Sequence, residues 1–257
     1  MAFAHLHVHT EYSLLDGSNK IKNYVARLKE LGMTAGAITD HGVMYGVIDF
    51  YKEAKANGIK PVLGCEVYVA PASRFDKDSA SEDRYFHLIL LAENNTGYSN
   101  LSHIVSRGFT EGYYYKPRVD LELLRQYHEG IICLSACLAG AIPRAISAGD
   151  YERAMEIARE YDNIFGHGNF YLELQDHGIP EQANVNTALL RMSRELDIPL
   201  VATNDCHYTR AEDAQAQDVL LCIQTQRKVS DDDRMRMGDD GSGSRTSSGA
   251  YGYAVFS

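Results

Sequence analysis

Short apolar segments alternate with longer amphipathic segments along most of this 257-residue sequence. The short segments are rich in aliphatic and β-branched residues, which is typical of β-strands. They cover residues 35–39, 60–70, 86–92, 130–136, 169–174 and 198–203. The longer segments repeat apolar residues at intervals of three and four, which is typical of helices. They cover residues 18–31, 44–57, 97–108, 139–148, 150–165, 180–196 and 211–226.

This alternation predicts an α/β fold built on a parallel sheet. Gly32 and Gly58 directly follow two of the predicted helices, at the position where glycine commonly ends a helix. At this length, a closed β/α barrel is the most economical arrangement. A doubly wound open sheet is the alternative, but it calls for a glycine-rich phosphate loop after the first strand, and the sequence has none there.

Composition excludes several classes of protein. No apolar run approaches the length of a membrane span, and no basic segment followed by an apolar one indicates a secretory signal. The five cysteines form no CxxC pair, so we expect reduced thiols in a cytoplasmic protein. A formal net charge of −10 argues against nucleic-acid binding through a broadly basic surface.

Three histidines, His5, His7 and His9, stand at alternate positions in the N-terminal segment "HLHVH". If residues 3–9 form a strand, the three imidazoles share one face. Histidine pairs of this kind are common metal ligands, although a polar strand edge with chance histidines is the alternative. Asp16 follows in the next loop.

Side chains that can bind metal recur where the predicted strands begin or end. They are His7, His9, Asp16, His41, Glu66, His87, Cys137, Asp205 and His207. Taken singly, His87 could be a core histidine, Cys137 an inert small side chain and Glu66 a solvated strand residue. Because the carboxyl ends of barrel strands converge on one face, the set as a whole predicts a multinuclear metal site there.

The predicted site has more ligands than one tetrahedral ion needs, so we expect two to three divalent metal ions. Histidine, carboxylate and one thiolate suit zinc or manganese, or else iron, better than magnesium or calcium. Clustered ions of this kind are well suited to hydrolysing phosphate esters.

Several motifs resemble the N-terminal PHP (polymerase and histidinol phosphatase) domain of bacterial replicative DNA polymerase III alpha subunits. They are "HLHVHTEYSLLDG", "ITDHG", "GCEVYV", "YYYKPRVD", "LELQDHGIPEQ" and "ATNDCHY". The resemblance covers about residues 1–237. It implies a distorted (β/α)7 barrel with up to three metal ions at the carboxyl ends of the strands.

The resemblance also implies how the ligands are shared among the ions. The first ion takes His7, His9, Glu66 and Asp205. Glu66 bridges to the second ion, which takes His87 and Cys137. The third takes Asp16, His41 and His207. His5 has no place in this set and is expected to be structural, and Asp205, His207 and Glu66 are the expected catalytic residues.

Members of this family that keep all nine ligands act as metal-dependent 3′–5′ exonucleases in proofreading, whereas others keep the domain as a non-catalytic scaffold. All nine are present here, which favours the exonuclease with a single-stranded DNA 3′ end as substrate. A metal-stabilised scaffold and a histidinol-phosphatase-type enzyme are the alternatives. The polymerase active site would lie beyond residue 257, in the remainder of a full-length alpha subunit.

Four features outside the ligand set carry further expectations. In "EGYYYKPRVD", Lys116 and Arg118 beside three tyrosines suit contact with single-stranded DNA, or else the tyrosines simply pack. Asp40 is expected to orient a ligand or to cap a turn. The charged stretch 73–84 predicts a surface loop, and residues 238–257 predict a flexible Gly/Ser-rich tail, disordered or foreign to the domain.

Overall fold

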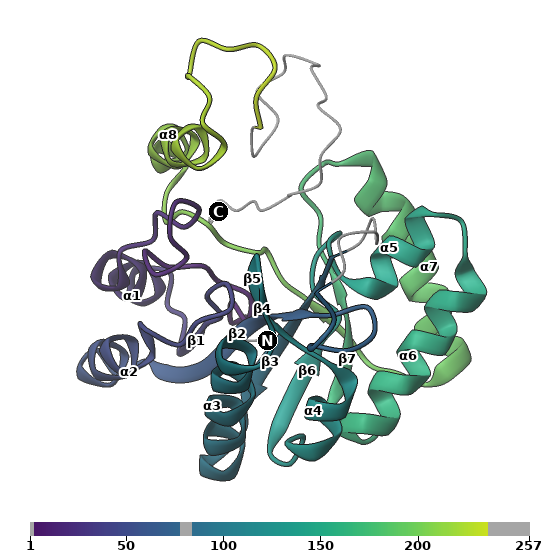
Figure 1. The fold of residues 1–257 in the computed structure, drawn as a ribbon. Coiled ribbons are helices and arrows are strands. Elements are labelled where there is room, and N and C mark those ends of the chain that lie inside the picture. Colours follow the sequence, from purple (N-terminus) through teal and green to yellow (C-terminus); the bar gives the residue numbers. More distant parts are fainter. Residues whose placement is uncertain (1–2, 78–83, 236–257) are drawn as a thin grey trace.

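The computed structural model describes residues 3–77 and 84–235. The predicted tail at residues 238–257 and the middle of the predicted insertion, residues 78–83, lie outside the described residues. Within the described part, helices surround a curled sheet, and α8 stands apart from the ring near α1 (Figure 1).

Every predicted strand and helix between residues 18 and 226 overlaps an observed one, and α3 is two residues longer at each end than predicted. The strands are β1 Ala35–Ile38, β2 Lys60–Val69, β3 Phe86–Ala92, β4 Tyr113–Tyr114, β5 Lys116–Val119, β6 Ile131–Leu134, β7 Phe170–Leu174 and β8 Leu200–Ala202. The helices are α1 Ile21–Glu30, α2 Val47–Ala56, α3 Asn95–Thr110, α4 Leu121–Gln126, α5 Ala141–Ser147, α6 Tyr151–Phe165, α7 Pro180–Leu196 and α8 Ala214–Thr225. The small elements β4, β5 and α4 are additions to the prediction.

The strands run in the order β4-β5-β2-β3-β6-β7-β8, and β1 pairs with the first half of β2. Most neighbours are parallel, as predicted, but β3 runs antiparallel to both β2 and β6, and the short β4 runs antiparallel to β5. The prediction of a wholly parallel sheet is wrong at these strands. A parallel return requires a crossover, usually a helix, and among the described residues no helix lies between β2 and β3.

The N-terminal segment joins the two edges of the sheet. The Thr39 amide donates to the Val8 carbonyl at 2.9 Å on one side, and the His9 amide donates to the Cys206 carbonyl at 2.8 Å on the other. Residues 5–9 are therefore an extended segment held by isolated bridges, not the regular strand expected over 3–9. Together with β1, β2, β3, β6, β7 and β8 it completes the distorted barrel.

Alternate residues of β3 pack on opposite sides of the sheet. Leu88 and Leu90 belong to the large core between the sheet and the outer helices, whereas Ile89 and Leu91 belong to the core inside the barrel. A third core packs α1 and α2 on the N-terminal segment, with Tyr24 and other side chains. This layering is the reason why the inner strands are apolar on both faces.

The start of α3 is fixed by a close backbone contact. The Asn94 side chain caps the helix by accepting from the Gly97 amide at 3.0 Å. A Cβ on Gly97 would lie 1.7 Å from the carbonyl oxygen of Gly130, which itself accepts from the Glu93 amide. No side chain fits at position 97, because the atoms in the way are backbone.

Gly97→Ala should therefore lower the free energy of unfolding by about 1–3 kcal/mol, the usual range for overpacking, and lower Tm by several degrees. Ser106→Ala, on the exposed side of the same helix, should change it by less than about 0.5 kcal/mol. Thermal and urea unfolding of both variants would measure the difference. Equal stabilities would contradict the close packing.

His5 lies behind the N-terminal segment, 2% exposed, with its Nδ1 3.3 Å from the Cys206 sulfur. Burial lowers the pKa of His5 from its ordinary 6.5 to about 4. The imidazole is therefore neutral in the folded protein at neutral pH. As pH falls below 6.5, the unfolded chain binds a proton at this residue before the folded protein does, so folding stability is lost between pH 6.5 and about 4.

His5→Asn should flatten the acid side of the stability profile. Between pH 7.5 and 5.5, the wild type should lose about 1 kcal/mol more unfolding free energy than the variant does. Urea unfolding at several pH values in one metal-free buffer would measure both curves. Parallel curves would show that His5 does not titrate as its burial requires.

Candidate metal centre

The predicted ligands gather at one end of the barrel because of how the strands run. His7 and His9 lie on the closing segment, and His41 follows β1 and bridges to Glu66 on β2. His87 is the second residue of β3, and because β3 runs antiparallel, its beginning lies at the edge where the parallel strands end. The reversed strand is thus what brings His87 to the site.

Three side chains surround the Nε2 atom of His7. The Nε2 of His9 lies at 3.1 Å, Asp205 Oδ1 at 3.1 Å and Glu66 Oε1 at 3.3 Å. All four residues are at most 2% exposed. These are the residues that the resemblance assigns to the first ion.

The remaining ligands connect to this centre. Glu66 contacts both His41 and His87, the latter at 3.0 Å, and the Cys137 sulfur lies 3.7 Å from the His87 Nδ1. Asp16 lies 2.9 Å from His41 Nε2 and 3.7 Å from His207 Nε2. The structure therefore brings all nine predicted residues into one connected cluster.

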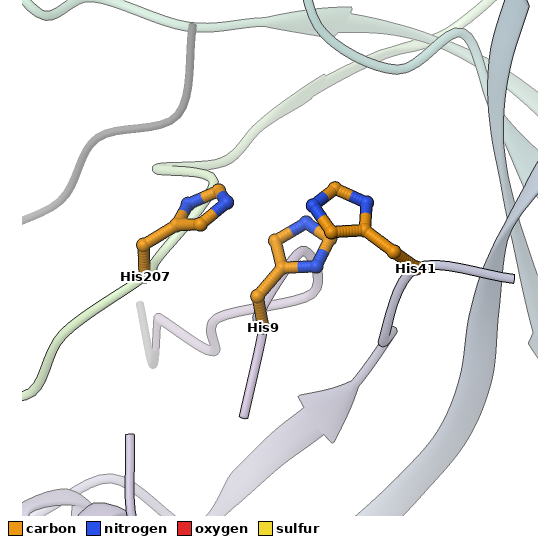
Figure 2. A group of neighbouring side chains, drawn as sticks. All are labelled: His9, His41 and His207. Carbon is orange, nitrogen blue, oxygen red and sulfur yellow. The ribbon is translucent and has the colours of Figure 1, made fainter. Parts of the chain in front are cut away.

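Figure 2 shows His9 between His41 and His207, which come from separate parts of the chain. The ring centroid of His9 lies 3.9 Å from that of His41 and 4.3 Å from that of His207, and both pairs are stacked. His9 therefore borders both the first and the third predicted ligand sets. This contact between sets is an aspect of the site that the sequence did not predict.

The donor atoms fit metal ions. Groups of residues whose ligand atoms lie within 4.8 Å of one another are His7, His9 and Glu66; His9, His41 and His207; and His41, Glu66 and His87. Among the described residues, Asp16 Oδ1, Glu66 Oε1 and Asp205 Oδ1 are buried carboxylate oxygens without a hydrogen-bond partner. Buried anionic oxygens beside imidazole nitrogens are a donor set that zinc, manganese or iron can satisfy.

The electrostatics of the cluster are strongly coupled. Burial acts to lower the pKa of His7, but the carboxylates of Asp205 and Glu173 outweigh it and raise the pKa above its ordinary value. Burial and the neighbouring His41 and His207 lower the pKa of His9. Burial raises the pKa of the Cys137 thiol, so binding of a metal there would release a proton.

Hydrogen bonds that involve Ser13 and Asp40 orient the His9 side chain. The Ser13 hydroxyl donates to Asp40 Oδ1 at 2.7 Å, so its oxygen can only accept from His9 Nδ1, 3.1 Å away. This places the proton of a neutral His9 on Nδ1 and leaves Nε2 free to bind a metal. Asp40 also accepts from the Thr10 amide and hydroxyl, which ties it to the N-terminal segment.

Glu173, on β7, is a member of the site that sequence reasoning missed. Its Oε1 lies 2.7 Å from His7 Nδ1, and both side chains are fully buried. The signal in the sequence is a single acidic residue within the apolar strand "FYLEL". A carboxylate in such a strand needs a polar partner inside the fold.

The two predicted DNA contacts differ in their surroundings. Arg118 is 3% exposed, and its guanidinium donates to the carbonyls of Gly112, Arg84 and Asp76 among others, whereas Tyr113 and Tyr115 of the same segment are exposed. Lys116 is half-buried, and its Nζ lies 5.3 Å from the ring centroid of Tyr68. The Tyr68 ring in turn stacks near His41, so Lys116 borders the cluster.

The predicted surface loop at 73–84 is partly buried. Arg74 is 8% exposed and donates to Asp120, the residue that caps α4, and to Glu111. The expectation of a surface loop holds for Phe75, Asp76 and Lys77, which are exposed, and Arg74 is the exception. A buried guanidinium with two carboxylate partners ties this segment to the barrel.

Two findings bear on the class of the protein. Within residues 3–77 and 84–235, no helix combines the length and apolar character that a membrane crossing requires. A solved amidohydrolase from Chromobacterium violaceum superposes with a TM-score of 0.53 over 82% of this chain and 89% of its own, at 14% identity. That likeness shows a shared fold.

Comparisons of sequence are more specific. The chain is 50% identical to DNA polymerase III subunit alpha of Treponema pallidum over 93% of its length, and 45% identical to that of Thermus aquaticus over 92%. It spans about a fifth of these curated relatives, 21% and 20%. The family model described as the PHP domain matches residues 5–177. This chain therefore belongs to the PHP domain family.

Proposed function

We propose that this chain is the PHP domain of a DNA polymerase III alpha subunit and works as a metal-dependent 3′–5′ exonuclease in proofreading. The observation that carries the proposal is the single cluster that contains all nine ligand-type residues, with buried carboxylate oxygens that no hydrogen bond satisfies. Identity of 41–50% to alpha subunits supports the polymerase setting.

The proposed ligand sets follow the contacts within the cluster. His7, His9, Glu66 and Asp205 would hold one ion. Glu66, His87 and Cys137 would hold a second. Asp16, His41 and His207 would hold a third. Zinc or manganese, or else iron, fits these donors. Such ions would supply Lewis acidity that makes water nucleophilic near neutral pH and offsets the charge of a phosphodiester.

The chain's own residues have distinct parts in this scheme. Glu66 contacts His7, His87 and His41, one histidine from each of the three sets, so it would connect all three. Asp205 contributes an anionic ligand beside His7 and His9. His207 Nδ1 donates to the Asp205 carbonyl at 2.9 Å, which turns Nε2 toward Asp16 and the third set.

DNA is the proposed substrate, as its single-stranded 3′ end. Lys116 is a cation that borders the cluster and would contact a phosphate, whereas Arg118 serves the packing of its own loop. With a net charge of −10, the domain should bind DNA weakly by itself, and the remainder of the alpha subunit would hold the strand. The proposed setting is the bacterial cytoplasm.

The first test concerns metal content. After expression in medium supplemented with zinc and manganese, elemental analysis should find two to three ions per chain. Replacing His7 and His9 together with alanine should remove at least one ion, because both side chains face the same centre. Less than one ion in the wild type would contradict the multinuclear site.

The second test concerns activity. On end-labelled single-stranded DNA, the protein should release mononucleotides from the 3′ end, and a chelator should stop it. Asp205→Asn replaces an anionic ligand by a neutral amide of nearly the same shape, so activity should fall by several orders of magnitude.

A matched control makes the same chemical change elsewhere. Asp197 ends α7 with a side chain that is 98% exposed and a left-handed backbone that asparagine accepts, so Asp197→Asn should keep full activity. Hydrolysis of small phosphomonoesters without DNA cleavage would favour the metabolite phosphatase. A fully metallated protein inert on both substrates would favour the scaffold.

A further inference from the structure

Glu173 is a buried carboxylate with all its hydrogen bonds on one oxygen. Oε1 accepts from His7 Nδ1 at 2.7 Å, from Gln175 Nε2 at 3.0 Å and from the Thr203 hydroxyl. The residue is 2% exposed, and its Oε2 is buried without a hydrogen-bond partner in the described chain. Among the described residues no lysine or arginine pairs with Glu173, so of its three donors His7 is the one that can carry a positive charge.

The position of Glu173 is held from several directions. Its amide donates to the Ser135 hydroxyl on the segment after β6 at 2.8 Å, and β7 pairs with both β6 and β8. Thr203 follows β8 and Gln175 follows β7, so the carboxylate sits between strands that cannot shift independently. A side chain fixed in this way can fix the orientation of what it binds.

The hydrogen bond between Glu173 and His7 decides which nitrogen of His7 carries the proton. A carboxylate can only accept, so at 2.7 Å the hydrogen lies on Nδ1. The amide nitrogen of Gln175 is also 3.4 Å from Nδ1, but this longer contact cannot form a bond to a nitrogen that is itself a donor. The lone pair of a neutral His7 is then on Nε2, the atom that faces His9, Asp205 and Glu66.

We propose that Glu173 is the positioning residue of the metal centre: it holds His7 as the Nδ1–H tautomer with Nε2 aimed at the metal, and it adds a buried negative charge behind that ligand. Glu173 is not one of the nine expected ligands, because it contacts the cluster through His7. It matches the role of Ser13 and Asp40 behind His9, so both histidines of the N-terminal segment are oriented from the side away from the metal. The inference rests on the metal centre of the proposed function, and not on its DNA substrate.

The test is zinc affinity, which does not depend on catalysis. Metal-stripped protein is titrated with zinc in competition with a chromophoric chelator. Glu173→Ala should weaken the tightest zinc site by about 10–100-fold. Glu173→Gln keeps the length of the side chain and an oxygen that can accept from Nδ1, so it should recover most of that loss. Glu156→Ala makes the same chemical change as Glu173→Ala on the outer helix α6, where the side chain is 62% exposed and far from His7, and should bind zinc as the wild type does.

A second readout covers the case in which Glu173→Ala does not fold. In zinc-loaded protein, long-range ¹H–¹⁵N NMR should show His7 with a hydrogen on Nδ1 in the wild type and in Glu173→Gln. A His7 that coordinates through Nδ1, or a Glu173→Ala variant that binds zinc within twofold of the wild type, would overturn the inference. Equal losses in the alanine and glutamine variants would also overturn it. If the wild type binds no zinc, the proposed metal centre is refuted, and this inference with it. If the protein binds zinc but does not cleave DNA, the proposed exonuclease is refuted and this inference still holds.

Discussion

The burial of negative charge at one end of the barrel is the constraint on which the rest of the structure depends. Glu66, Asp205 and Glu173 are each at most 2% exposed. Ionised carboxylates are stable inside a protein only when cations or strong donors lie beside them. Histidines supply that partnership here, and His87 and His41 lower the pKa of Glu66 against the effect of burial, which alone would raise it. Bound metal ions would balance the same buried negative charge without requiring the histidines to be protonated.

Barrel closure and ligand placement depend on the same segment. Residues 5–9 bond to β1 on one side and to the chain around Cys206 on the other, while the side chains of His7 and His9 point into the cluster. The backbone that joins the sheet edges thus also sets the distance between His7 and Asp205. Because a ligand that binds only the folded state stabilises it, metal binding and folding stability should be linked in this domain.

A site residue could be predicted from the sequence when its residue type and position alone indicate its chemistry. The nine predicted ligands stand out as metal-binding residue types at strand ends, and the structure places these side chains together. Glu173 was missed because one acid in an apolar strand does not indicate its partner 166 residues away. Arg118 was predicted to contact DNA because it stands beside three tyrosines. Its guanidinium instead donates to backbone carbonyls of Gly112 and Asp76, and no sequence pattern indicates bonds of this kind. Leu15, Ala136 and Asp205 have positive φ without being glycine, so loop shapes beside three ligands had no sequence signal either.

The sequence by itself determined the α/β class, the order of the main strands and helices, the ligand types and the family, because periodicity and residue chemistry are local properties. Only the tertiary structure decided the direction of β3, the contact of His9 with two ligand sets, and the carboxylates behind the histidines. Direction matters most for His87, which reaches the metal end only because its strand is reversed. These features depend on contacts between residues far apart in the chain, and the energy of such contacts exists only once the barrel has closed.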